Sequence, residues 1–135
     1  MRKTVLDGKQ WIFELLKNGG IKNVISGDIY KDRRPVGSTK EDAVINSVSM
    51  NEEFLQDGVF NINIYIPYLR VKINGIDQDM PNEVRQKIIM NFVKPLLESV
   101  YTKDYNLKLE FHDVLDDAKD NWINFRVNMK AFNNN

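Results

Sequence analysis

The clearest pattern in the chain is a strict alternation of apolar and polar residues between positions 59 and 68. The apolar set is Phe60, Ile62, Ile64, Ile66 and Tyr68, and the set between them is Asn61, Asn63 and Tyr65. Because successive side chains of a strand point to opposite faces, one face of this strand is predicted to pack against a core. The other face is polar but uncharged, so it can be wet or can meet another protein at a modest desolvation cost.

Other segments alternate in the same way and predict further strands. They cover residues 43–50, 107–111 and 123–131, with a short strand expected around residues 24–30. Asp57-Gly58 is a hairpin signal, which predicts that strand 43–50 pairs antiparallel with the strand at 59–68. Asn74-Gly75 predicts a turn in the connection from Leu69 to Met80.

Apolar residues at helical spacing predict two helices. The first covers about residues 3 to 17 and ends at Asn18-Gly19-Gly20, since glycine adopts the left-handed conformation of a C-cap at little cost. The second begins near Pro81, and its apolar stripe continues to Val100. The predicted fold class is α+β, a largely antiparallel β-sheet with two α-helices packed on one face.

Three segments are predicted to be irregular. Residues 31–41 are mostly polar and contain Pro35, which predicts an exposed, mobile loop. Residues 113–120 are acidic and predict a solvated turn between strands. Asn133-Asn134-Asn135 are expected to fray.

Composition narrows the possible function classes. A length of 135 residues fits one domain, residues 1–135. Lys plus Arg and Asp plus Glu both total 19, so the net charge is zero, which argues against nucleic acid as the main partner. There is no cysteine to form a disulfide or a thiolate site. No apolar run approaches the length of a membrane span, so we expect no membrane partner.

Candidate reactive residues do not combine into a site. His112 precedes Asp113, but neighbouring residues of a strand point apart. Asp113, Asp116, Asp117 and Asp120 carry oxygen ligands, yet the acidic segment lacks the glycine and closing glutamate of a calcium loop. We therefore predict no catalytic residues, no metal and no cofactor, and a protein that is not an enzyme.

Two surfaces are better candidates for binding another protein. The loop at 31–41 is interpreted first as a solvated loop, then as an arm that reaches a neighbouring subunit, and last as a phosphate-binding patch that includes Lys40. Tyr65, between two asparagines, lies opposite the core face, where an aromatic ring has no internal role. The candidate subunit-interface residues are Lys31, Arg33, Arg34, Pro35, Asn61, Asn63 and Tyr65.

Several short sequence motifs, and their order along the chain, resemble those of a known family. A first helix ending in Asn18-Gly19-Gly20 is followed by Ser26-Gly27-Asp28-Ile29-Tyr30, then by Arg33-Arg34-Pro35, and later by the long strand at 60–68 and two closing strands. This order, over about residues 5 to 132, is similar to that of the tail terminator and tail-completion proteins of long-tailed phages, which include minor tail and head-tail joining proteins. The longer segment at 69–80 departs from the family pattern.

The resemblance implies a structural role in a phage or prophage virion, assembled in the bacterial cytoplasm. Such proteins form rings, typically hexameric, that terminate the tail tube or join it to the head, and they bind neighbouring tail or head-tail proteins without a cofactor. Two other classes stay open. One is a monomeric ligand- or peptide-binding module that uses the face around Tyr65, and the other is a small cytoplasmic enzyme built around His112.

Overall fold

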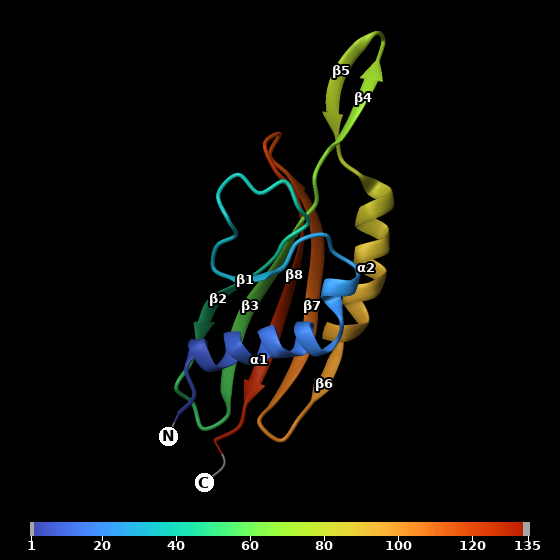
Figure 1. Cartoon of the computed structure of the whole chain (residues 1–135). Helices are drawn as coiled ribbons and strands as arrows, with labels where there is room; N and C mark the ends of the chain where they lie inside the picture. Colours follow the sequence, from blue (N-terminus) through green and yellow to red (C-terminus); the bar gives the residue numbers. More distant parts are fainter. Residues whose placement is uncertain (1, 134–135) are drawn as a thin grey trace.

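The structure is a computed structural model that describes residues 2–133 (Figure 1). The expectation of fraying at Asn134 and Asn135 lies outside the described residues. In chain order the elements are α1 (Val5–Asn18), the short 3-10 helix η1 (Ile21–Asn23), β1 (Ile29–Lys31), β2 (Ala43–Met50), β3 (Gln56–Tyr65), β4 (Leu69–Ile73), β5 (Ile76–Met80), α2 (Glu83–Leu97), β6 (Ser99–Tyr101), β7 (Tyr105–Asp116) and β8 (Asn121–Ala131).

The predicted α+β class is confirmed. Six strands form one sheet in the order β1-β2-β3-β8-β7-β6, and β4 and β5 form a separate hairpin. Every neighbouring pair in the sheet is antiparallel except β1 with β2. β1 is the short strand expected around residues 24–30. It begins only at Ile29, near the C-terminal end of that range, and ends at Lys31.

Both helices cover one face of this sheet, as predicted (Figure 1). The core between the layers is formed by buried side chains of α1, α2 and the central strands. It includes Ile12, Leu16, Ile89, Val93, Phe60, Ile62, Ile64, Ile123, Phe125 and Val127. The alternation in β3 therefore has the predicted cause, because each apolar position meets a helix and each polar position faces away.

The start of α1 shows why a glycine occurs inside this helix. Thr4 caps α1 in a capping box with Asp7, which satisfies free backbone N–H groups of the first turn. Gly8 follows, and a Cβ at that position would lie 2.4 Å from Cζ of Phe60. Because Phe60 is fully buried and cannot move aside, only a residue without a side chain allows α1 to approach β3 this closely.

The β2–β3 hairpin is confirmed, but the turn is not at Asp57-Gly58. Both residues lie inside β3, where Gly58 pairs with Met50 and Met129. The chain reverses between Met50 and Gln56 instead. The cause is the buried Gln56 side chain, which donates to the backbone carbonyls of Lys3 and Asn51 and so starts the strand earlier than the turn signal suggests.

Two other boundaries differ from the prediction, and one connection is more regular than predicted. Residues 113–116 belong to β7, so the acidic turn is confined to residues 117–120. Val100 lies in β6, because α2 ends at Leu97 and the chain then pairs with the start of β7. The segment at 69–80 is the β4–β5 hairpin, with the predicted turn at Asn74-Gly75.

No helix within residues 2–133 is both long and apolar enough to cross a membrane.

Two substitutions on β3 test which face is buried. Ile64→Asp is expected to lower the free energy of unfolding by several kcal/mol, because it places a charge among fully buried apolar side chains. Asn63→Asp is expected to cost much less, because a carboxylate can still accept the hydrogen bond from Asn124. Urea unfolding midpoints measure both. Equal losses would show that the assignment of the two faces is wrong.

Candidate functional site

The face of the sheet opposite the helices is the candidate site, and we call it the open face. Its centre consists of the outward side chains of β3 and β8, paired as Asn61 with Arg126, Asn63 with Asn124, and Tyr65 with Trp122. Both helices, α1 and α2, pack on the other face of the sheet (Figure 1). The centre of the face therefore presents amides, aromatic rings and one arginine, and the charged side chains of Asp57, Lys108 and Lys130 lie toward its other end.

The polar part of the open face is organised by hydrogen bonds between side chains. The Asn124 amide nitrogen donates to the side-chain oxygen of Asn63 at 2.7 Å and to that of Asn61 at 3.3 Å. Arg126 Nε donates to the same Asn61 oxygen at 3.2 Å. This ladder fixes the amides in one arrangement, so a partner would meet a preformed polar surface and would lose little side-chain entropy on binding.

Aromatic rings flank the hydrogen-bonded ladder of amides at the end of the open face nearer the β4–β5 hairpin. The Tyr65 and Trp122 ring centroids are 5.7 Å apart, and the Arg34 guanidinium lies 4.0 Å from the Tyr65 ring centroid. Burial raises the pKa of the Tyr65 hydroxyl, and the positive charge of Arg34 opposes this shift. The phenol is therefore neutral near pH 7 and serves as a hydrogen-bonding aromatic surface.

A β-bulge adds a second aromatic group that the sequence pattern misassigned. Leu107, Leu109 and Phe111 were expected to share one face of a strand. The pairing of β7 with β8 shifts between Leu109 and Phe111, which turns Phe111 onto the open face. Its ring lies 5.4 Å from the Arg126 guanidinium and is 48% exposed. The sequence carries no glycine or proline there to signal the bulge.

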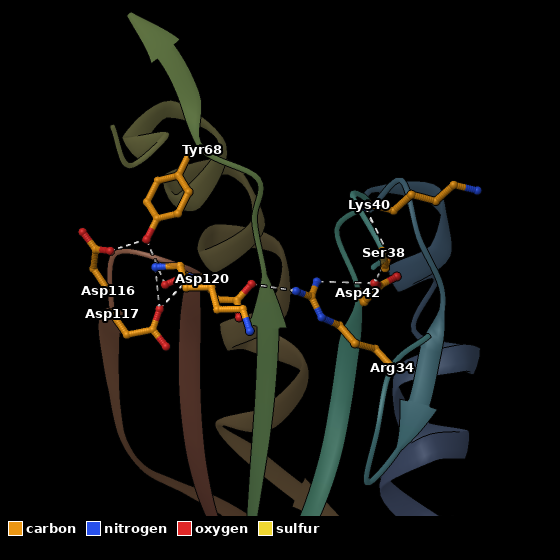
Figure 2. A network of polar contacts seen from close by, with 9 residues as sticks. Arg34, Ser38, Lys40, Asp42, Tyr68, Asp116, Asp117 and Asp120 are labelled. Atoms are coloured by element: carbon orange, nitrogen blue, oxygen red, sulfur yellow. Dashed lines mark hydrogen bonds and ion pairs between the residues drawn. The ribbon is translucent and has the colours of Figure 1, made fainter. Parts of the chain in front are cut away.

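The loop at 31–41 is exposed along most of its length but is anchored by Arg34 (Figure 2). Arg34 forms ion pairs with Asp42 at 3.5 Å and with Asp120 at 3.0 Å. Asp42 is only 1% exposed, so Arg34 compensates a buried charge. Arg34 therefore joins the loop to the turn between β7 and β8 and is not a free contact for a neighbour.

The other candidate residues of the loop are more accessible. Arg33 and Pro35 are exposed. Lys31 lies in β1, where its ammonium donates to Gln10 and lies 5.3 Å from the Phe13 ring centroid. The sequence-predicted interface set therefore divides in two. Arg34 joins the Tyr65 end of the open face, and Lys31 lies against α1.

A second polar network closes the same end of the sheet (Figure 2). Tyr68 was expected on the apolar face of β3, but β3 ends at Tyr65, and the Tyr68 hydroxyl donates to the Asp116 carboxylate and to the Asp120 carbonyl oxygen at 2.9 Å. Desolvation and the nearby Asp116 carboxylate raise the pKa of Tyr68. Backbone N–H groups of residues 119 and 120 bind the Asp117 carboxylate and lower its pKa.

These acids and His112 do not form a reactive or metal-binding cluster. The acids bind Tyr68, Arg34 and the backbone of their own turn, and no group of three or more His, Asp or Glu side chains within residues 2–133 could hold a metal ion. His112 is exposed, with its ring 6.3 Å from that of Phe125, while Asp113 pairs with Asn124 on the opposite face. The arrangement supports recognition of another surface and offers no geometry for a His-Asp base.

Comparison with known proteins adds no family assignment. The chain matches no protein-family model and no curated protein sequence.

Replacing Arg34 tests whether this residue is structural. Arg34→Ala is expected to lower the free energy of unfolding by roughly 2 to 3 kcal/mol, because it leaves the buried Asp42 carboxylate without its cation. The neighbouring Arg33→Ala is the matched control and should change it by less than about 0.5 kcal/mol, since Arg33 is exposed. Chemical denaturation measures the free energy of unfolding of both variants. Equal losses in the two variants would contradict the anchoring role of Arg34.

Proposed function

We propose that this chain is a structural subunit of a phage or prophage tail, which assembles into a ring that terminates the tail tube and/or joins the tail to the head. The main support for this proposal is the composition of the open face, which combines an ordered amide ladder with aromatic and arginine side chains. Tyr, Trp and Arg are the residues that contribute most often to binding energy between proteins.

The arrangement of elements supports the same proposal. α1, the extended segment around Arg33-Arg34-Pro35, the long strand before α2 and the two closing strands follow the order expected from the tail terminator resemblance. The β4–β5 hairpin remains the departure from that pattern. In this proposal the subunit carries out no reaction and needs no cofactor, and the virion is its final location.

The anchored loop changes how the ring contact is assigned. Asn61, Asn63 and Tyr65 form a contact surface together with β8, and Arg34 supports that surface from within the subunit. Arg33 and Pro35 are the loop residues that remain free to meet a neighbour. A contact between unlike surfaces of identical subunits repeats from copy to copy and forms a ring when the rotation between copies closes.

One observation favours a second candidate function, a monomeric peptide-binding module. A groove of about 400 Å³ lies on the open face beside β6, where Tyr101, Lys108 and Asn128 line it. An extended peptide would fit such a groove next to the short edge strand. This function requires a stable monomer, so the oligomeric state separates the two candidates.

Sedimentation velocity over a concentration series up to about millimolar, with the natural tail partners added at the highest concentration, tests the ring. The expected result is a species several times heavier than the 15.8 kDa subunit. Asn63→Arg, which places a long charged side chain in the centre of the open face, is expected to weaken assembly at least tenfold, or about 1.4 kcal/mol.

Asn91→Arg is the matched control, because it makes the same exchange at an exposed position on α2. It should leave assembly unchanged. The ring is excluded if the wild-type protein remains a monomer throughout, even with its tail partners present. The open face is excluded as the contact if both variants assemble equally well.

A further inference from the structure

The β4–β5 hairpin stands away from the body of the molecule (Figure 1). Its register places Leu69, Val71 and Ile73 of β4 on one face together with three residues of β5, namely Ile76, Gln78 and Met80. Ile73 is 41% exposed and Ile76 is 68% exposed. The hairpin therefore presents an uncovered apolar face at its tip.

The opposite face of the hairpin is charged and internally paired. Arg70 bonds Asp79 at 3.2 Å, and Lys72 lies 3.9 Å from Asp77. Because a two-stranded hairpin alone is marginally stable in water, surface ion pairs of this kind do not account for its order. An occupant that covers the apolar face would stabilise it.

The free edge of β7 is a surface that such a hairpin can join. β6 pairs only with residues 106–108 of β7, so the outer edge of residues 109–116 has no neighbouring strand among the described residues. Unpaired backbone N–H and C=O groups along an edge can accept a further strand. Beside this edge, α2 and β7 enclose a groove of about 440 Å³ that Pro81, Met90 and Val114 line.

The side chains of the edge and of the hairpin alternate in a complementary way. Val114 lies on the side of the sheet that faces α2, and Asp113 lies on the open side. A paired β4 strand would place its apolar side chains toward Met90 and Val114, and its Arg70 and Lys72 toward Asp113.

Charge selects β4 over β5 as the strand that pairs. Residues 109–116 contain Glu110, Asp113 and Asp116 and no lysine or arginine. β4 carries two basic side chains and no acid, whereas β5 carries Asp77 and Asp79. Like charges on adjacent strands repel, so β5 is the unfavourable choice.

We propose that β4 of one copy adds as a strand to the free edge of β7 in the next copy, with the apolar face of the hairpin in the groove beside α2. This inference rests on the proposed ring, because it names the second contact through which copies join. Each copy supplies one hairpin and one edge at different places on its surface, so the contact propagates from copy to copy around a ring.

Two charge-inverted variants test the pairing by sedimentation velocity. The inverted hairpin carries Arg70→Glu and Lys72→Glu together with Asp77→Asn and Asp79→Asn, so that β4 becomes acidic, no like charges meet inside the hairpin, and β5 does not become basic. The inverted edge carries Glu110→Lys and Asp113→Lys. Each variant alone is expected to raise the concentration needed for assembly at least tenfold, because like charges then meet along the new strand pair.

An equimolar mixture of the two variants is expected to assemble as the wild-type protein does. In the mixture the acidic hairpin meets the basic edge, and the unaltered basic hairpin meets the unaltered acidic edge, so alternating copies restore every contact.

Ile73→Ser with Ile76→Ser provides a variant that keeps all charges. It should weaken assembly while leaving the thermal melting of the subunit unchanged, since both side chains are exposed.

The outcomes separate this inference from the ring itself. If the wild-type protein forms rings and all variants assemble normally, the hairpin contact between copies is overturned and the ring is not. The apolar face of the hairpin would then contact a different protein. Loss of assembly in both charge variants without recovery in the mixture would also overturn it. A wild-type protein that remains monomeric would overturn the ring and the hairpin contact together.

Discussion

The unbroken pairing of β3 with β8 is the constraint on which the rest of the structure depends. Ten consecutive residue pairs, from Gln56 with Ala131 to Tyr65 with Trp122, keep the two central strands in one register. Because side chains alternate, this register decides every side chain's face at once, and a shift of one residue would exchange core and surface. Each large core side chain buried there contributes about 1.5–3 kcal/mol, so the register is strongly specified.

The consequence for function is a sheet with two different faces. α1 and α2 pack against one face, and the centre of the other face carries an amide ladder, two neighbouring aromatic rings and arginines. The loop around Arg34 closes one end of that open face and uses Asp42 and Asp120 as its anchors. The central strands thus present a surface, and the acids at the end of the sheet bind Tyr68, Arg34 and the backbone of their own turn.

Alternation and turn chemistry were sufficient to predict the α+β class, the buried set in β3 and the outward set that includes Asn63 and Tyr65. They were insufficient where an interaction joins distant parts of the chain. The bulge that exposes Phe111 has no local signal, and the partners of Arg34 lie 8 and 86 residues away. Gln56 likewise begins β3 early through bonds to Lys3 and Asn51, which no pattern of hydrophobicity reveals.

Fluorescence quenching of Trp122 by dissolved acrylamide measures whether the open face is buried between copies. In a Trp11→Phe background, Trp122 is the only tryptophan, and it reports on the open face beside Tyr65. Acrylamide quenching is expected to fall sharply as the protein concentration rises and the subunits assemble. Unchanged quenching in a sample that sedimentation shows to be assembled would contradict the account.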